Sequence, residues 1–146
     1  MKRMESRLRT FLTGLLIVIS FAGCKPLIAL YDASAYSQAV SIKVDLLNLL
    51  DKAATTEFTA ANADISMVTI EIQKAMEYSK GKDLNSLSTS QYEILLSGSH
   101  SYKFFLQLWE KEKKLSKGAS TEYKETFGMI MDKIIQLENG KNKEKK

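Results

Sequence analysis

The chain has 146 residues, of which 45% are hydrophobic and 26% are charged, and its formal net charge is +4. That charge is concentrated at the ends: residues 1–23 and residues 141–146 each carry +3, and the body between them carries −2. The body is slightly acidic, and no arginine follows Arg9. Both features argue against nucleic-acid binding, because phosphate recognition favours clustered basic side chains and bidentate arginine. One cysteine and one histidine exclude a disulfide framework and the usual zinc-ligand sets.

Residues 1–23 have the pattern of a signal peptide. Four basic side chains lie in the first ten residues, residues 11–21 are almost wholly apolar, and the small residues Ala22 and Gly23 follow. A basic head, a short apolar run and small residues are typical of an exported chain. The alternative is an uncleaved membrane anchor. A bilayer span needs about 20 apolar residues, and Lys25 and Pro26 interrupt this run too early.

The segment Ala22, Gly23 and Cys24 resembles the lipobox of bacterial lipoproteins, although Phe21 stands where that family usually has leucine or another aliphatic residue. The resemblance implies that Cys24 receives a diacylglycerol, that the chain is cut between Gly23 and Cys24, and that the new amino terminus is acylated, for example with palmitate. It therefore implies a lipid-anchored protein of the cell envelope. Lys25 is not the aspartate that the family associates with inner-membrane retention, so an outer-membrane position facing the periplasm is expected if the source has two membranes.

The part after Cys24 is expected to be an all-α bundle of four or five helices, because its hydrophobic periodicity is helical throughout. We expect a lipidated tether at residues 24–33, a single bundle domain at residues 34–140 and a lysine-rich disordered tail at residues 141–146. Three phrases in this part, YSQAVSIKVDLLNLL, AMEYSKG and LQLWEKE, are similar to those of small, all-helical, uncharacterised bacterial lipoproteins. This second resemblance implies no activity and no site.

The first helix is expected to run to about residue 54, with Asp32 or Ser34 as its N-cap. Its apolar residues cover more than half of the helix circumference, which indicates a central helix with two or more neighbours. The 4/3 spacing is kept by Tyr36, Val40, Leu47, Leu50 and Ala54, and the apolar side is widened by Ile42, Leu46 and Leu49. Lys43 falls inside this apolar arc. Its amine either reaches solvent, pairs with Asp51 or with a carboxylate on another helix, or forms a polar contact in a groove that binds an apolar or anionic ligand.

The second helix is predicted over residues 58–79, where apolar residues keep strict 3/4 spacing from Phe58 to Ala75 and Ser79 takes the next position. Its stripe is out of phase with that of the first helix. The two segments therefore form either one long helix with a stutter or a hairpin of antiparallel helices. We favour the hairpin, because antiparallel neighbours bury both stripes.

Three further helices are predicted after a polar connector. The first covers residues 90–96, where Ser90 and Glu93 match a capping box. The second covers residues 102–115, and the third covers residues 121–138.

Residues 102–109 contain aromatic or leucine side chains at six of eight positions, which exceeds one buried helical stripe. Part of this segment is therefore expected to be exposed, and exposed aromatic surface marks a contact with a partner or a membrane. We assign Phe104, Leu108 and Trp109 to a partner-binding surface. Trp109 is the strongest candidate, because tryptophan is enriched among residues that dominate binding energy.

The sequence offers little equipment for catalysis. His100 lies in a Ser/Gly loop without an acid nearby in sequence, and neither a nucleophile elbow nor a phosphate loop is present. We therefore expect no enzyme activity, no cofactor and no metal. The expected function is that of a membrane-anchored, non-enzymatic protein-binding module of the cell envelope. The alternative is a carrier of lipids or small apolar ligands, with a groove along residues 36–54.

Overall fold

The computed structural model describes residues 28–141, and these form an all-α fold, as expected. The predicted signal peptide, Cys24, most of the tether and residues 142–146 lie outside the described residues. The elements are α2 (Ala33–Ala53), the short 3-10 helix η1 (Phe58–Ala61), α3 (Asn62–Lys80), α4 (Ser86–Ser97), α5 (Tyr102–Glu112) and α6 (Lys117–Asn139).

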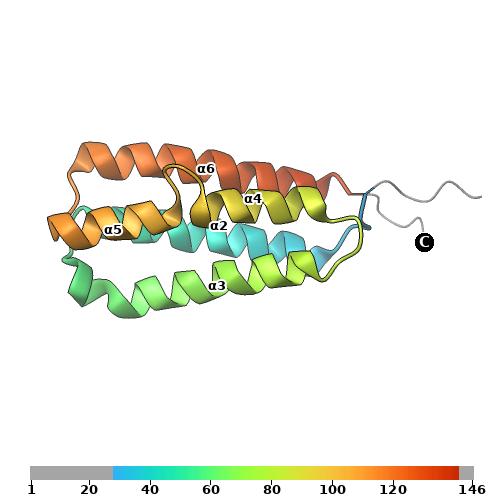
Figure 1. The fold of residues 1–146 in the computed structure, drawn as a ribbon, viewed down its shortest axis with the longest axis horizontal. Coiled ribbons are helices and arrows are strands. Elements are labelled where there is room, and N and C mark those ends of the chain that lie inside the picture. The colour runs from blue at the N-terminus through green and yellow to red at the C-terminus, as the bar shows by residue number, and fades with distance from the viewer. Residues whose placement is uncertain (1–27, 142–146) are drawn as a thin grey trace, which may run out of the picture.

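The helices form a bundle with up-down-up-down topology (Figure 1). Helix α2 packs against α3 and α6, and α4 packs against the same two helices from the opposite side. Helices α4 and α5 run end to end and together make the fourth column of the bundle (Figure 1). Residues 28–32, the α3–α4 loop and the end of α6 meet at one end, which we call the base. The turn at residues 54–57 and the loop at residues 113–116 form the distal end.

The hairpin prediction for residues 34–79 is confirmed. Helix α2 ends at Ala53, and the amides of Thr55 and Thr56 both donate to the carbonyl of Lys52, which closes the turn. The predicted stripe of α3 is buried along its length at Ile65, Val68, Ile72, Ala75 and Ser79. The sequence predicts this buried face because no polar residue interrupts the apolar stripe of 3.6-residue period before Ser79.

The centre of the buried face of α2 differs from the expected one. The fully buried residues are Ala39, Ile42, Leu46, Leu49, Leu50 and Ala53, whereas Tyr36, Val40 and Leu47 flank them. Ile42, Leu46 and Leu49, which were expected only to widen the apolar side, therefore lie at its centre. Asp32 is the N-cap, and its Oδ1 accepts hydrogen bonds from the amides of Ser34 at 2.8 Å and Ala35 at 3.3 Å.

Four predicted helix boundaries are wrong. Helix α3 begins at Asn62 rather than at residue 58, since Phe58–Ala61 form the separate 3-10 helix η1. Helix α4 begins at Ser86, so the Ser90–Glu93 pair lies inside the helix and is no capping box. Helix α5 ends at Glu112, because Lys113 adopts a left-handed conformation with φ 67°. Helix α6 begins at Lys117, where Ser116 is the N-cap and its Oγ accepts a hydrogen bond from the Ala119 amide at 3.2 Å. Glycine is unfavourable inside a helix, and Gly118 therefore led to the prediction of a loop where α6 makes its first turn.

Candidate functional site

Trp109 belongs to the core, so its assignment to an exposed partner-binding surface is wrong. Its side chain is 0% exposed. Its ring centroid lies 5.6 Å from that of Phe58 and 5.7 Å from that of Phe105, and its Nε1 donates a hydrogen bond to the Thr56 carbonyl at 3.2 Å. Helix α5 lies against two neighbouring elements, so large side chains can be buried over the whole inward-facing part of its surface. A buried tryptophan with a satisfied N–H is a packing residue.

Phe104, in contrast, is 55% exposed, and Leu108 is half-buried against the core. Because they are four residues apart on α5, they lie on one face of the helix. Their neighbour Phe105 contacts Tyr123 and Phe127 of α6, whereas Tyr102 hydrogen-bonds with Thr69 of α3. By helical spacing, Phe104 therefore points outward from α5, and Leu108 lies between it and the α6-facing Phe105.

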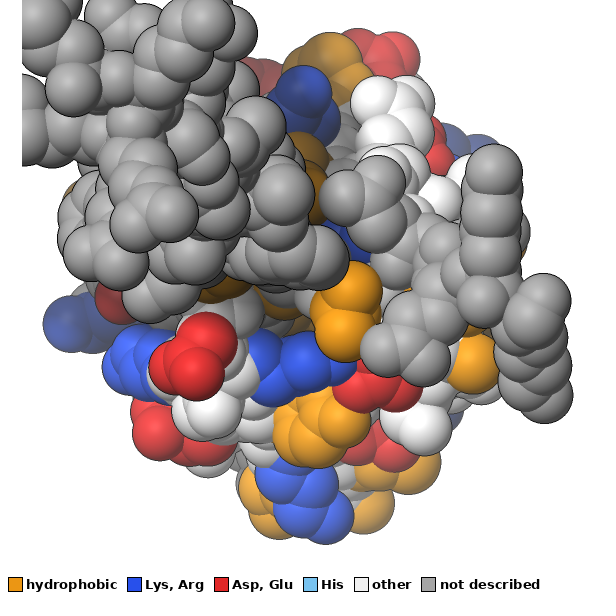
Figure 2. Space-filling view, turned by 90° about the vertical axis from the view of Figure 1, so that its right-hand side faces the viewer, with side chains coloured by type: hydrophobic (Ala, Val, Ile, Leu, Met, Phe, Trp, Pro, Cys, Tyr) orange, Lys and Arg blue, Asp and Glu red, His pale blue; other side chains and the backbone are white. Residues whose placement is uncertain are grey.

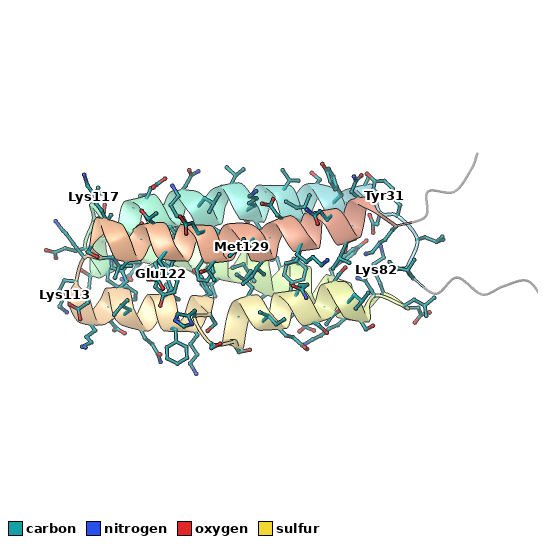
Figure 3. The ribbon with its side chains drawn as sticks, turned by 90° about the horizontal axis from the view of Figure 1, so that it is seen from above. Tyr31, Lys82, Lys113, Lys117, Glu122 and Met129 are labelled. Carbon is teal, nitrogen blue, oxygen red and sulfur yellow. The ribbon has the colours of Figure 1, made fainter. Side chains whose placement is uncertain are left out.

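Ile94 on α4 is also exposed, at 47%. Thr89 hydrogen-bonds with Ser79 of α3 at 2.9 Å, and Ile94, five residues later, points away from that α3-facing side. We define Ile94, Phe104 and Leu108 as the lateral patch. On the neighbouring helix, the exposed Met129 lies midway along α6 (Figure 3).

Lys43 takes part in an ion pair at the edge of the α2–α6 contact. Its Nζ lies 2.5 Å from Oδ1 of Asp132 on α6, and the two side chains are 27% and 52% exposed. Asp51, the acid suggested as its partner, pairs instead with Lys124 at 2.7 Å. A carboxylate on another helix therefore holds the ammonium of Lys43, and the geometry gives no support to its role in a ligand groove.

His100 lies exposed in the loop between α4 and α5, in a left-handed conformation with φ 60°. In residues 28–141, no group of three or more His, Cys, Asp or Glu side chains is arranged to hold a metal ion. His100 therefore forms part of the short connection between α4 and α5.

A polar cluster at the base was not anticipated from the sequence. Oδ2 of Asp32 accepts hydrogen bonds from Nζ of Lys82 at 2.6 Å and from the hydroxyl of Tyr78 at 2.5 Å. The pairing with Lys82, followed by the Tyr78 hydroxyl, holds the pKa of Asp32 well below its ordinary value. The hydrogen bond to the Asp32 carboxylate raises the pKa of Tyr78. Figure 3 places Tyr31 and Lys82 at this end, opposite Lys113 and Lys117.

Lys141 is also part of the base, and its assignment to a disordered tail is wrong. Its side chain is 1% exposed, and its Nζ lies 2.5 Å from both Oε2 of Glu138 and Oδ1 of Asn85. The Asn85 amide donates in turn to Oγ of Ser79 at 2.8 Å. Burial, followed by the nearby charge of Glu138, raises the pKa of Tyr92. One signal was available: Glu138 continues the buried stripe of Phe127, Met131 and Ile134.

Comparison with known proteins assigns no family. No protein-family model matches the chain, and neither the curated proteins nor the solved structures contain a significant match. Among the described residues, no helix combines the length and the apolar character needed to cross a membrane.

Proposed function

We propose that this chain is a lipid-anchored, non-enzymatic protein-binding module of the cell envelope, and that the lateral patch is its contact surface. The observation that supports the proposal is the exposure of Phe104 beside the buried Phe105. An aromatic side chain left half in water on a rigid helix gains free energy when a partner covers it.

The rigidity of the patch supports a binding role. Phe105 packs against four aromatic rings, those of Tyr102, Trp109, Tyr123 and Phe127, at centroid distances of 5.5–6.0 Å. Phe104 is carried on the same turn of α5, so its position is held by the interior. A preorganised anchor loses little conformational entropy when it is covered.

The composition of the same face also fits a protein partner. Lys111 follows Phe104 by seven residues and continues its face of α5 with a positive charge. An apolar centre with a charged rim is the usual arrangement of a protein interface. The patch is small, so the proposed contact is a transient one.

The carrier alternative gains less support. The inner face of α2, where the groove was expected, packs its buried residues against α3 and α6. Ala39, Leu46 and Leu50 on that face are each 0% exposed. The hollows along α2 lie at its outer edges, and the one beside α6 is lined by charged side chains such as Asp51 and Lys124 as well as by Leu47.

The test is site-specific photo-cross-linking in the lipidated full-length chain, in membranes of the source. A photoreactive residue replaces Phe104, and a matched control replaces Met67, an exposed apolar residue on α3. We expect a discrete adduct at position 104 that is absent at position 67 and is lost when Ile94→Asp is added. Equal adducts at both positions, or none at position 104, would contradict the proposal.

A further inference from the structure

The base carries exposed leucines where the fold does not require them. Leu84 and Leu87 are 51% and 61% exposed, and Leu30 is exposed beside them in the chain entering α2. We call these three residues the base leucines. Figure 2, which looks onto this end, shows hydrophobic side chains among lysines and acids in the part that the grey residues leave visible.

Leu84 is unusual in its backbone as well. It has φ 60°, a conformation that glycine and asparagine adopt at much lower cost than a residue with a larger side chain. Leu84 is 51% exposed, so it presents apolar surface at the base in a backbone conformation that glycine or asparagine would adopt at lower cost.

The base leucines are held in place by the chain that leads to Cys24. The Ala29 amide donates to the carbonyl of Leu84 at 3.1 Å. Three residues later, Asp32 is paired with Lys82 at 2.6 Å, on the same α3–α4 loop. These contacts connect the segment before α2 to the α3–α4 loop, so the two segments are held together.

The length of the intervening chain fixes what this end can reach. Ala29 comes five residues after Cys24 in the chain, and five fully extended residues span about 17 Å. A lipid on Cys24 therefore keeps the base within about that distance of the membrane surface. This step rests on the lipid anchor of the proposed function.

We propose that the base leucines dock onto the lipid bilayer, so that the anchored bundle stands on its base rather than swinging freely on its tether. Leucine side chains on a rigid loop insert at the boundary between headgroups and acyl chains. Among the described residues, the lysines beside these leucines are paired with acids, Lys82 with Asp32 and Lys80 with Glu77 at 3.2 Å. The proposed contact is apolar insertion of the leucines, and the lipid composition used in the test separates it from attraction to anionic lipid.

Standing on the base gives the bundle a fixed direction. Helix α2 has 21 residues, which corresponds to about 32 Å at 1.5 Å per residue. The lateral patch extends from α4 onto α5, which lies beyond α4 from the base (Figure 1). The proposed partner of Phe104 would then meet the module above the headgroups.

The test uses the acylated full-length chain in phosphatidylcholine vesicles. Leu87→Cys is labelled with an environment-sensitive fluorophore, and Met67→Cys near the distal end is the matched control. Spin-labelled lipids report contact by quenching. We expect a blue shift and quenching at position 87, and neither at position 67. Vesicle flotation tests the anchor separately: a chain that floats without quenching at position 87 overturns the docking alone, whereas a chain that does not float overturns the anchor.

A second variant shows that the leucines carry the contact. Leu84→Asn suits the left-handed backbone and removes the apolar side chain, so it is expected to keep the melting temperature while the quenching of a label at Leu30→Cys is lost. The matched control Ile70→Gln on α3 retains that quenching. Quenching confined to vesicles with added phosphatidylglycerol would overturn apolar docking, and a blue shift without lipid quenching would show that protein, not lipid, covers the base.

Discussion

The ammonium of Lys141 lies 2.5 Å from the carboxylate of Glu138, and both side chains are almost completely buried at the end of α6. Asn85 accepts from the same ammonium at 2.5 Å and connects it to the α3–α4 loop. This pair fastens the last described residue to the base. A buried ion pair is sensitive to the loss of one partner, because the remaining charge has no water to solvate it.

Replacing Lys141 with methionine is expected to destabilise the domain by about 3–5 kcal/mol, because the Glu138 carboxylate is left buried without its cation. Urea unfolding followed by circular dichroism measures the change. The double variant Lys141→Met/Glu138→Leu is expected to recover most of the loss, since no charge remains buried.

The control for this prediction is Lys133→Met on the exposed face of α6, which is expected to change stability by less than about 0.5 kcal/mol. A Lys141→Met variant as stable as this control would show that residue 141 is solvated, as the sequence alone suggested.

Asp32 predicts a specific response of stability to acid. Its pKa is lowered in the folded state by Lys82 and by the Tyr78 hydroxyl, so the folded state favours the ionised form. The stabilisation is complete above the unfolded pKa, which is about 4, and is lost as the pH falls through the lower folded pKa. Wild type is therefore expected to lose more stability than Asp32→Asn on acidification below about pH 4.

Asparagine is a suitable comparison because it keeps the N-cap of α2 and removes only the charge. The measurement is the difference in unfolding free energy between the two proteins at neutral pH and at successive acid values. Parallel curves for wild type and Asp32→Asn would show that the contacts of Asp32 with Lys82 and Tyr78 do not favour its charge.

Periodicity predicted the buried face of α3 correctly, because each position of its stripe from Ile65 to Ser79 is occupied by a residue that tolerates burial. It placed the centre of α2 wrongly, since Ile42, Leu46 and Leu49 are buried at the centre while Tyr36, Val40 and Leu47 lie at the edges. The helix and its approximate face are readable from one sequence. The centre of a face depends on how closely the neighbours approach.

The contacts at the base could not be predicted from the sequence for a similar reason. Asp32 and Lys82 are 50 residues apart, and an isolated aspartate near a predicted helix start looks like a cap and nothing more. Which of Phe104 and Trp109 is exposed and which is buried depends on where α3 and α6 lie around α5. Helical spacing limits how many side chains are buried, but not which sector faces inward.

The adjacent residues Phe104 and Phe105 provide a matched pair. Phe105→Ala is expected to cost about 3–5 kcal/mol, because it opens a cavity among four rings. Phe104→Ala is expected to change stability by less than about 0.5 kcal/mol, because its ring is largely in water. Thermal unfolding of the two variants measures both values, and similar melting temperatures would contradict the assigned orientation of α5.

Cys24 is expected to carry the lipid anchor on which the membrane proposals rest. Cys24→Ala removes the thiol that would bear the diacylglycerol, so incorporation of labelled fatty acid should be abolished and maturation at this site blocked. Because two or more acyl chains bind a membrane far more stably than one, the variant should also leave the membrane fraction once residues 1–23 are removed. The described domain begins at Ile28, so its melting temperature is expected to stay the same. Equal fatty-acid labelling of wild type and variant would exclude Cys24 as the attachment site.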